Sequence, residues 1–317
     1  MDHKFITRYS TEVIGYLSSS SLFQDWPYCR QILLDFLAGD EPWMHALPIL
    51  ASQAVGGESK ESIPVAAAWT VMHHAANLID DVQDGDLKFR EKIQQTETAL
   101  TVAIAWIFIA FQMLDDPSIK QSARDRIVSI FSRSGFDSSM GQYQDLIGKR
   151  GRSENIDPLQ DYWNSVILKS GSIYRAGTAG GAAVGTNSSA KIEALSDFGT
   201  ALGVIRQVID DCRDTNLDAK NKDKLSTLPT VIYTLMMDQQ TDRVGFDIKS
   251  YGLSRIPLPD ETGRLFTEAS IPEIIVDILL EWRRRALESL QVLKPSQSKK
   301  SLVDIIEYVL SSPSISP

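Results

Sequence analysis

Cysteine is scarce in this sequence, and the few cysteines present do not form a site. Only two, Cys29 and Cys212, occur in 317 residues, and their separation fits neither a metal site nor a redox pair. The first ten residues, MDHKFITRYS, lack the apolar run and the cleavage site of a signal peptide. We therefore expect reduced thiols and a cytoplasmic location.

Basic residues are outnumbered by acidic ones. The chain has 32 lysines and arginines against 41 aspartates and glutamates, which gives a net charge of −9 and a pI near 5.0. With no basic stripe to neutralise phosphates, nucleic acid is not an expected partner. Most of the acidic excess is ordinary solvated surface, although a site that gathers divalent cations would leave the same balance.

Long apolar runs are also missing. The longest stretch without a charged residue or a histidine extends from Thr98 to Leu114 and includes the polar residues Thr101 and Gln112. A helix that spans a membrane needs about 20 predominantly apolar residues. The stretch therefore predicts a core helix of a folded domain and no membrane span.

Strand signals are nearly absent, whereas helical periodicity recurs along the whole chain. Ser62, before Ile63 and Pro64, is typical of a helix N-cap with proline in the first turn. The small residues from Gly177 to Gly185 predict either a close approach of helices or room for a group between them. Helices are predicted over residues 62–84, 92–114, 158–185, 190–215, 271–293 and 299–310. The expected fold is all-α, with one helical domain over residues 1–317 and a disordered tail at about 311–317.

Two clusters of aspartates share one spacing and follow apolar helical sequence. The first consists of Asp80, Asp81 and Asp84, and the second of Asp210, Asp211 and Asp214. In a helix, residues i and i+4 point to the same side, so the carboxylates of each cluster repel one another. One such cluster fits a solvated helix end equally well, but two matched clusters favour a metal site.

Magnesium is the ion that suits these carboxylates. It binds one or two carboxylates, keeps several waters, and shares the rest of its shell with a substrate phosphate. Six aspartates and a diphosphate with about three negative charges need two or three Mg²⁺ ions and nearby lysines for balance. A calcium loop is excluded, because the EF-hand spacing and its glycine are missing.

Five short segments together resemble the trans-polyprenyl diphosphate synthase family. Residues 73–84 (HHAANLIDDVQD) and 207–214 (QVIDDCRD) resemble its first and second aspartate-rich motifs. Residues 141–146 (GQYQDL), 168–174 (LKSGSIY) and 224–229 (KLSTLP) resemble its GQxxDL, KTG and K-x-TLP segments. Their order and spacing agree with those of the family over roughly residues 30–235.

The resemblance implies an antiparallel helix bundle around a deep central cavity, in a protein that is usually a homodimer. It implies that the two aspartate clusters face each other at the cavity mouth and hold Mg²⁺ on an allylic prenyl diphosphate substrate. It also implies that Lys169, Gln207 and Lys224 contact that diphosphate, with Arg90 as a further candidate.

The sequence departs from the family where elongating members bind isopentenyl diphosphate. Residues 39–44 (GDEPWM) stand in register with a basic G-K-R-x-R-P element, and only Arg90 remains of two arginines after the first motif. Asp40 and Glu41 would repel a second diphosphate. The sequence therefore predicts a class I terpene synthase, which ionises one C15 or C20 prenyl diphosphate and releases a terpene or a terpene alcohol. Small residues at Ala75 and Ala76 fit a chain of that length.

Three alternatives stay open. The first is a chain-elongating synthase of the farnesyl or geranylgeranyl diphosphate type, with an isopentenyl diphosphate site that uses Lys88 and Arg90. The second is a prenyltransferase that acts on a peptide or small-molecule acceptor. The third is a non-catalytic subunit, which the intact aspartates disfavour.

Aromatic side chains could stabilise a carbocation by cation–π attraction, although each is more often ordinary core packing. The candidates are Trp69, Trp106, Phe108, Phe111, Tyr143, Trp163 and Tyr174.

Overall fold

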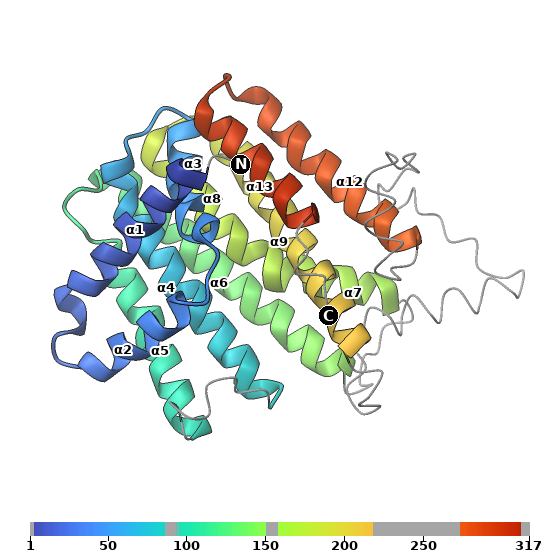
Figure 1. Cartoon of the computed structure of the whole chain (residues 1–317), viewed down its shortest axis with the longest axis horizontal. Coiled ribbons are helices and arrows are strands. Elements are labelled where there is room, and N and C mark those ends of the chain that lie inside the picture. Colours follow the sequence, from blue (N-terminus) through green and yellow to red (C-terminus); the bar gives the residue numbers. More distant parts are fainter. Residues whose placement is uncertain (1–2, 86–92, 94, 150–157, 218–272, 312–317) are drawn as a thin grey trace, which may run out of the picture. The chain divides into compact units, whose positions relative to one another are not determined.

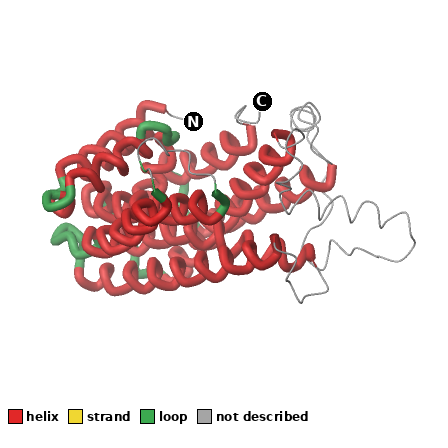
Figure 2. Tube along the Cα trace, turned by 90° about the horizontal axis from the view of Figure 1, so that it is seen from below, coloured by secondary structure: helices red, strands yellow, loops and turns green. Residues whose placement is uncertain are grey.

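The computed structural model describes residues 3–85, 93, 95–149, 158–217 and 273–311. These residues form helices and the short turns between them, with no strand among them (Figure 2). The predicted all-α class is confirmed. The disordered tail cannot be compared, since Ser311 ends the last helix and the residues after it lie outside the described ranges.

The chain divides into two compact units. The first comprises residues 1–134, 175–196 and 291–303, and the second comprises residues 135–174, 197–290 and 304–317. Each unit is described by itself below. The single domain and the central cavity stay predictions.

Helices α1 to α5 belong to the first unit. Their bounds are His3–Ser19 for α1, Pro27–Leu37 for α2, Pro42–Ala54 for α3, Ser59–Gln83 for α4 and Thr96–Met113 for α5, with a short 3-10 turn at Ser21–Phe23. Helix α4 packs against α1, α3 and α5 (Figure 1). The largest side chains of this core, Trp43, Trp69 and Trp106, are almost completely buried.

Helix α4 begins one turn earlier than its sequence suggests. Ser62 was predicted as the N-cap, but the helix starts at Ser59, and the Ser62 hydroxyl donates to the Glu58 and Ser59 carbonyls. Pro64 therefore lies inside the helix. Ser62 therefore also lies inside the helix, whose N-cap is Glu58, so the capping prediction was wrong at this position.

Helix α5 is, among the described helices, the one long and apolar enough by length and composition to cross a membrane, which is weak evidence by itself. One face is buried, with Trp106 at its centre, while Ile104 and Phe108 on the other face are 52% and 65% exposed. The prediction of a core helix therefore holds for one face only.

The small residues of α8 (Ser172–Gly185) lie against neighbouring helices of the first unit. A Cβ added to Gly177 would lie 2.8 Å from the Trp69 ring, and one added to Gly181 would lie closer than 3.0 Å to the Pro48 backbone. Of the two interpretations of this run, the close approach of helices is therefore the correct one for these two glycines.

The second unit contains parts of longer helices and one distorted turn. Helix α6 spans Gln121–Lys149, α7 spans Pro158–Val166, α9 spans Ser189–Leu217, α12 spans Glu273–Ser289 and α13 spans Gln297–Ser311, with a 3-10 turn at Leu290–Val292. The predicted continuous helix over residues 158–185 is interrupted by a π-helical turn at Ile167–Gly171. π-Turns inside helices are rare, and the helical periodicity of the sequence does not reveal this one.

Candidate active site

The first aspartate cluster lies at the carboxyl end of α4. Asp80 and Asp81 are in its last turn, Asp84 is the C-cap, and Gly85 with φ 72° terminates the helix in the left-handed region. A helix carries partial negative charge at this end, and the last turn of α4 holds no basic residue. Three carboxylates in this position favour a bound cation.

The second cluster lies near the end of α9. Asp211 accepts hydrogen bonds from the Tyr162 hydroxyl at 2.6 Å and from Gln207 Nε2 at 3.0 Å. Burial raises the pKa of Asp211 to about 7, against the opposing effect of these two donors. Asp210 lies 3.7 Å from Arg206 Nη2. Asp214 belongs to the same helix, but its side chain lies outside the described part of the structure.

Lys169 projects from the π-turn toward a second carboxylate. Its Nζ lies 3.5 Å from Asp145 Oδ2, and both side chains are largely buried. Ser170, the next residue, donates to Gln207 Oε1, so Gln207 links the π-turn to Asp211. The charges of Asp145 and Lys169 also act on the pKa of Asp211, the first raising it and the second lowering it.

The structure therefore brings three of the predicted site residues together, namely Lys169, Gln207 and Asp211. Lys224 and Arg90 lie outside the described residues. The two clusters belong to different units, so their placement across one cavity mouth stays a prediction.

The carboxylates fit magnesium better than a metal held by protein ligands alone. Within the described ranges, no group of three or more histidine, cysteine, aspartate or glutamate side chains could hold an ion. Magnesium does not need such a cage, because waters and substrate phosphates complete its shell. A buried carboxylate such as Asp211 is moreover costly to ionise without a cation nearby.

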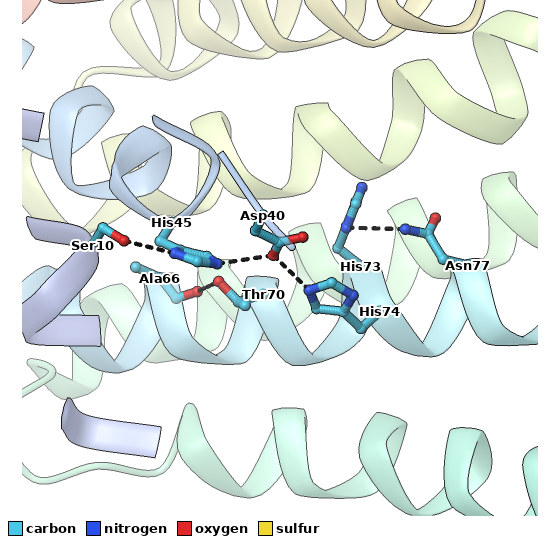
Figure 3. A network of polar contacts seen from close by, with 8 residues as sticks. All are labelled: Ser10, Asp40, His45, Ala66, Thr70, His73, His74 and Asn77. Atoms are coloured by element: carbon cyan, nitrogen blue, oxygen red, sulfur yellow. Dashed lines mark hydrogen bonds and ion pairs between the residues drawn. The ribbon is translucent and has the colours of Figure 1, made fainter. Parts of the chain in front are cut away.

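Asp40 is the centre of a buried polar network in the first unit (Figure 3). His45 Nε2 and His74 Nε2 donate to one carboxylate oxygen at 2.9 and 2.8 Å, and the Ser10 hydroxyl lies 2.9 Å from His45 Nδ1. Burial alone would raise the pKa of Asp40, but the hydrogen bonds and charges of His45 and His74 outweigh it and hold the pKa well below its ordinary value.

Glu41 is also engaged. It accepts a hydrogen bond from Trp43 Nε1 at 2.6 Å. The sequence argument treated Asp40 and Glu41 as free charges facing a second diphosphate. In the structure Asp40 accepts hydrogen bonds from two imidazoles and Glu41 from an indole, and the effect of their charges on a second diphosphate stays a prediction.

Comparison with known proteins decides the family. The profile of the Polyprenyl synthetase family matches residues 42–242, more than half of the chain. This chain belongs to the polyprenyl synthetase family. The resemblance drawn from its motifs is thereby confirmed. The chain is an enzyme of this family.

Two curated relatives of this chain align along most of their length. The short chain isoprenyl diphosphate synthase of Methanothermobacter thermautotrophicus is 26% identical over 290 residues, covering 86% of each chain. The geranylgeranyl diphosphate synthase of Methanosarcina mazei is 24% identical over 282 residues, again covering 86% of each.

A solved structure gives the same fold. The geranylgeranyl pyrophosphate synthetase of the archaeon Geoglobus acetivorans superimposes with a TM-score of 0.76 over 97% of both chains. At 18% identity this likeness concerns the fold alone.

Six of the seven aromatic candidates separate into two groups, and the seventh, Phe111, is half-buried. Trp69, Trp106, Trp163 and Tyr174 are buried. Phe108 and Tyr143 are 65% and 64% exposed, so neither is part of the buried core. They are apolar residues at helical spacing whose helix face is turned to the surface.

Sequence reasoning missed Tyr162, the hydroxyl donor to Asp211. It precedes Lys169 by seven residues, or two helical turns, and this spacing is a signal that could have placed both on one side of a helix. Asp145 was recognised as part of a motif but was not given a role. The structure places its carboxylate 3.5 Å from Lys169 Nζ, where it holds the lysine in position.

Proposed function

We propose that this enzyme elongates an allylic prenyl diphosphate by condensing it with isopentenyl diphosphate. The observation that carries this proposal is its alignment with two prenyl diphosphate synthases over 86% of each chain. This is the first alternative of the sequence analysis, and it is better supported than terpene synthesis. The reaction breaks the carbon–oxygen bond of the donor and releases its diphosphate, joins the donor carbon to the alkene of the acceptor, and releases a proton from the acceptor.

The donor diphosphate is assigned to the second unit. Lys169 supplies a cation there, and its partner Asp145 holds it at 3.5 Å. Gln207 accepts from Ser170 and donates to Asp211, and these two hydrogen bonds fix its orientation. The second N–H of its amide is thereby preorganised to donate to an incoming anion. Groups oriented before the reaction stabilise developing charge without a reorganisation cost.

Magnesium is the implied cofactor, in two or three ions. Asp80, Asp81 and Asp84 on α4 and Asp210, Asp211 and Asp214 on α9 would hold it. When bound, it neutralises the charge that builds on the departing diphosphate. Tyr162 and Gln207 orient Asp211 for this task by donating one hydrogen bond to each of its oxygens.

A second candidate function is ionisation without isopentenyl diphosphate, which yields a terpene or a terpene alcohol. One observation favours it. At residues 39–44, where elongating members carry basic residues, the side chains that contact Asp40 in the described structure are the imidazoles of His45 and His74. The isopentenyl diphosphate site assigned to Lys88 and Arg90 lies outside the described residues and stays a prediction.

Products formed with and without isopentenyl diphosphate distinguish the two functions. Purified protein is incubated with Mg²⁺ and farnesyl or geranylgeranyl diphosphate, and products are identified by gas chromatography–mass spectrometry before and after phosphatase treatment. We expect a longer prenyl alcohol that appears after phosphatase treatment and requires isopentenyl diphosphate. A terpene formed from the donor alone would overturn elongation and establish the second candidate.

Two variants tie the products to the aspartate clusters. Asp81→Ala removes a carboxylate from the first cluster, and we expect it to abolish either reaction. Asp125→Ala removes an exposed carboxylate from α6 and serves as the matched control. Equal activity in both variants would contradict a role for the first cluster.

A further inference from the structure

The π-turn that carries Lys169 is enclosed by two glycines from different helices. Gly141 is on α6 and Gly203 is on α9, and both belong to the second unit with the turn itself. A π-turn breaks the regular ladder of backbone hydrogen bonds, and such turns inside helices occur often at functional sites. The contacts that hold this π-turn in place therefore also determine where Lys169 and Ser170 lie.

Neither glycine could carry a side chain without moving the turn. A Cβ added to Gly141 would lie closer than 3.0 Å to Lys169 N, Leu168 C and Leu168 Cβ. One added to Gly203 would lie 2.6 Å from Ser170 O and 2.9 Å from Gly171 Cα. Most of these atoms are backbone, which cannot swing aside as the end of a flexible side chain can.

Hydroxyl groups bond the carbonyls that the irregular turn exposes. Ser138, one turn before Gly141 on α6, donates to Lys169 O at 3.0 Å. Ser172 donates to Leu168 O at 2.5 Å. The turn is thus fixed by steric contact on two sides and by hydrogen bonds to two of its own carbonyls.

The position of the turn is passed on to the candidate active site. Lys169 Nζ reaches Asp145, and the Ser170 hydroxyl donates to Gln207, which donates in turn to Asp211. A displaced turn would move the lysine and break the first link of this chain of hydrogen bonds.

We infer that Gly141 and Gly203 are positioning residues for the diphosphate site, because they let α6 and α9 close on the π-turn and thereby set the places of Lys169 and Gln207. The inference rests on the proposed function through the assignment of Lys169 to the donor diphosphate. Neither glycine touches the substrate in this account.

Gly181 provides a matched control in the first unit. It also presses on backbone, since a Cβ there would lie closer than 3.0 Å to Pro48 O, C and Cα. Gly181→Ala therefore brings a comparable steric conflict without reaching the π-turn. A general loss of stability weakens diphosphate binding in all three glycine variants. A positioning role weakens it in Gly141→Ala and Gly203→Ala but not in Gly181→Ala.

The test is calorimetric titration of the full chain with inorganic diphosphate in the presence of Mg²⁺, with thermal unfolding recorded for every variant. Because misplacement by about 1 Å can cost a large factor, we expect Gly141→Ala and Gly203→Ala to raise the Kd by about ten-fold and Gly181→Ala by less than about two-fold. An unchanged Kd in both first-named variants, or an equal rise in Gly181→Ala, would overturn the inference.

Two further variants complete the design. Lys169→Ala must weaken diphosphate binding; if it does not, the assignment within the proposed function fails, and the inference fails with it. If it does weaken binding while the glycine variants do not, only the inference fails. Should the glycine variants not fold, Ser138→Ala decides, because it loosens the turn without a steric conflict. A raised Kd supports the inference and an unchanged Kd overturns it.

Discussion

Asp40 shows how a single acid can be retained in a mostly buried position. Its side chain is 13% exposed, and two imidazoles from α3 and α4 donate to the same oxygen. Removing one member of such a buried polar group leaves the polar atoms that faced it without a partner, which costs more than the group itself contributes. The network therefore ties the start of α3 to α4, the helix that carries the first aspartate cluster.

Replacing Asp40 should destabilise the protein. We expect Asp40→Ala to lower the free energy of unfolding by about 3 kcal/mol, since two buried donors lose their acceptor. Urea unfolding at neutral pH measures this, with Asp125→Ala as an exposed control. A loss no larger than that of the control would contradict the network.

The same contribution should depend on pH. Because the folded pKa of Asp40 is lowered, its stabilising effect is complete above the unfolded pKa, near 4, and is lost as the pH falls below it. The stability difference between wild type and Asp40→Asn should therefore be constant from pH 7 to about 5 and shrink toward about pH 3. A difference that grows on acidification would refute this sign.

Tyr162 should act through Asp211. The phenol donates to a predicted metal ligand, and such partners orient the ligand for the ion. We expect Tyr162→Phe to raise the Mg²⁺ concentration for half-maximal activity by about ten-fold. Tyr143→Phe, which changes an exposed tyrosine, is the control. Identical Mg²⁺ curves in the two variants would exclude the proposed contact.

At the scale of elements, periodicity located the helices well and their irregularities poorly. The predicted helix over residues 190–215 is Ser189–Leu217, and the predicted stop after Leu114 agrees with α5 ending at Met113. The start of α4 and the π-turn at Ile167–Gly171 were missed. The π-turn is packed against residues of α6 and α9, so a local pattern carries little information about it.

The candidate site was likewise predictable only in part. Carboxylate spacing within one helix was visible in the sequence, and so was Lys169 through its motif. The hydrogen bond from Tyr162 to Asp211 joins residues 49 positions apart, and the one from His74 to Asp40 joins residues 34 apart. Such pairs arise only when the helices pack, and for that reason the hydrogen-bond partners of Asp40 and Asp211 were not visible in the sequence.

Helix α4 should also influence the length of the accepted chain. Ala76 lies one turn before Asp80 and is partly exposed, whereas Ala75 is fully buried. We expect Ala76→Phe to shift the products of a mixed-substrate assay toward shorter chains, since the ring fills space near the diphosphate. Asn77→Phe adds the same ring on an exposed face and should not. Unchanged products in Ala76→Phe would contradict a chain that runs along α4.

At the scale of the whole molecule, an apolar face of α5 supports the predicted homodimer. Ile104 and Phe108 lie one turn apart and are 52% and 65% exposed. A second copy could bury such a face, because most homo-oligomers use twofold contacts. We expect a dimer in sedimentation analysis that Phe108→Asp converts to monomer, while Phe136→Asp, at an equally exposed site on α6, does not. A monomeric wild type would refute this expectation.

The family and the all-α class were predictable from the sequence, because the order of five motifs constrains both. The sequence did not decide the reaction. The sequence favoured terpene synthesis from the sign of two charges, whereas the relatives that align over 86% of each chain are prenyl diphosphate synthases. The lack of basic residues in one segment removes one contact to isopentenyl diphosphate. The rest of that acceptor site can be assembled from several other segments.

Incorporation of isopentenyl diphosphate tests the central claim most directly. The protein is given farnesyl diphosphate, Mg²⁺ and carbon-13-labelled isopentenyl diphosphate, and the product is analysed by mass spectrometry after dephosphorylation. Elongation predicts a product longer by at least one isopentenyl unit and heavier by the full label of that unit. A product made from the farnesyl chain alone, without label, would contradict it.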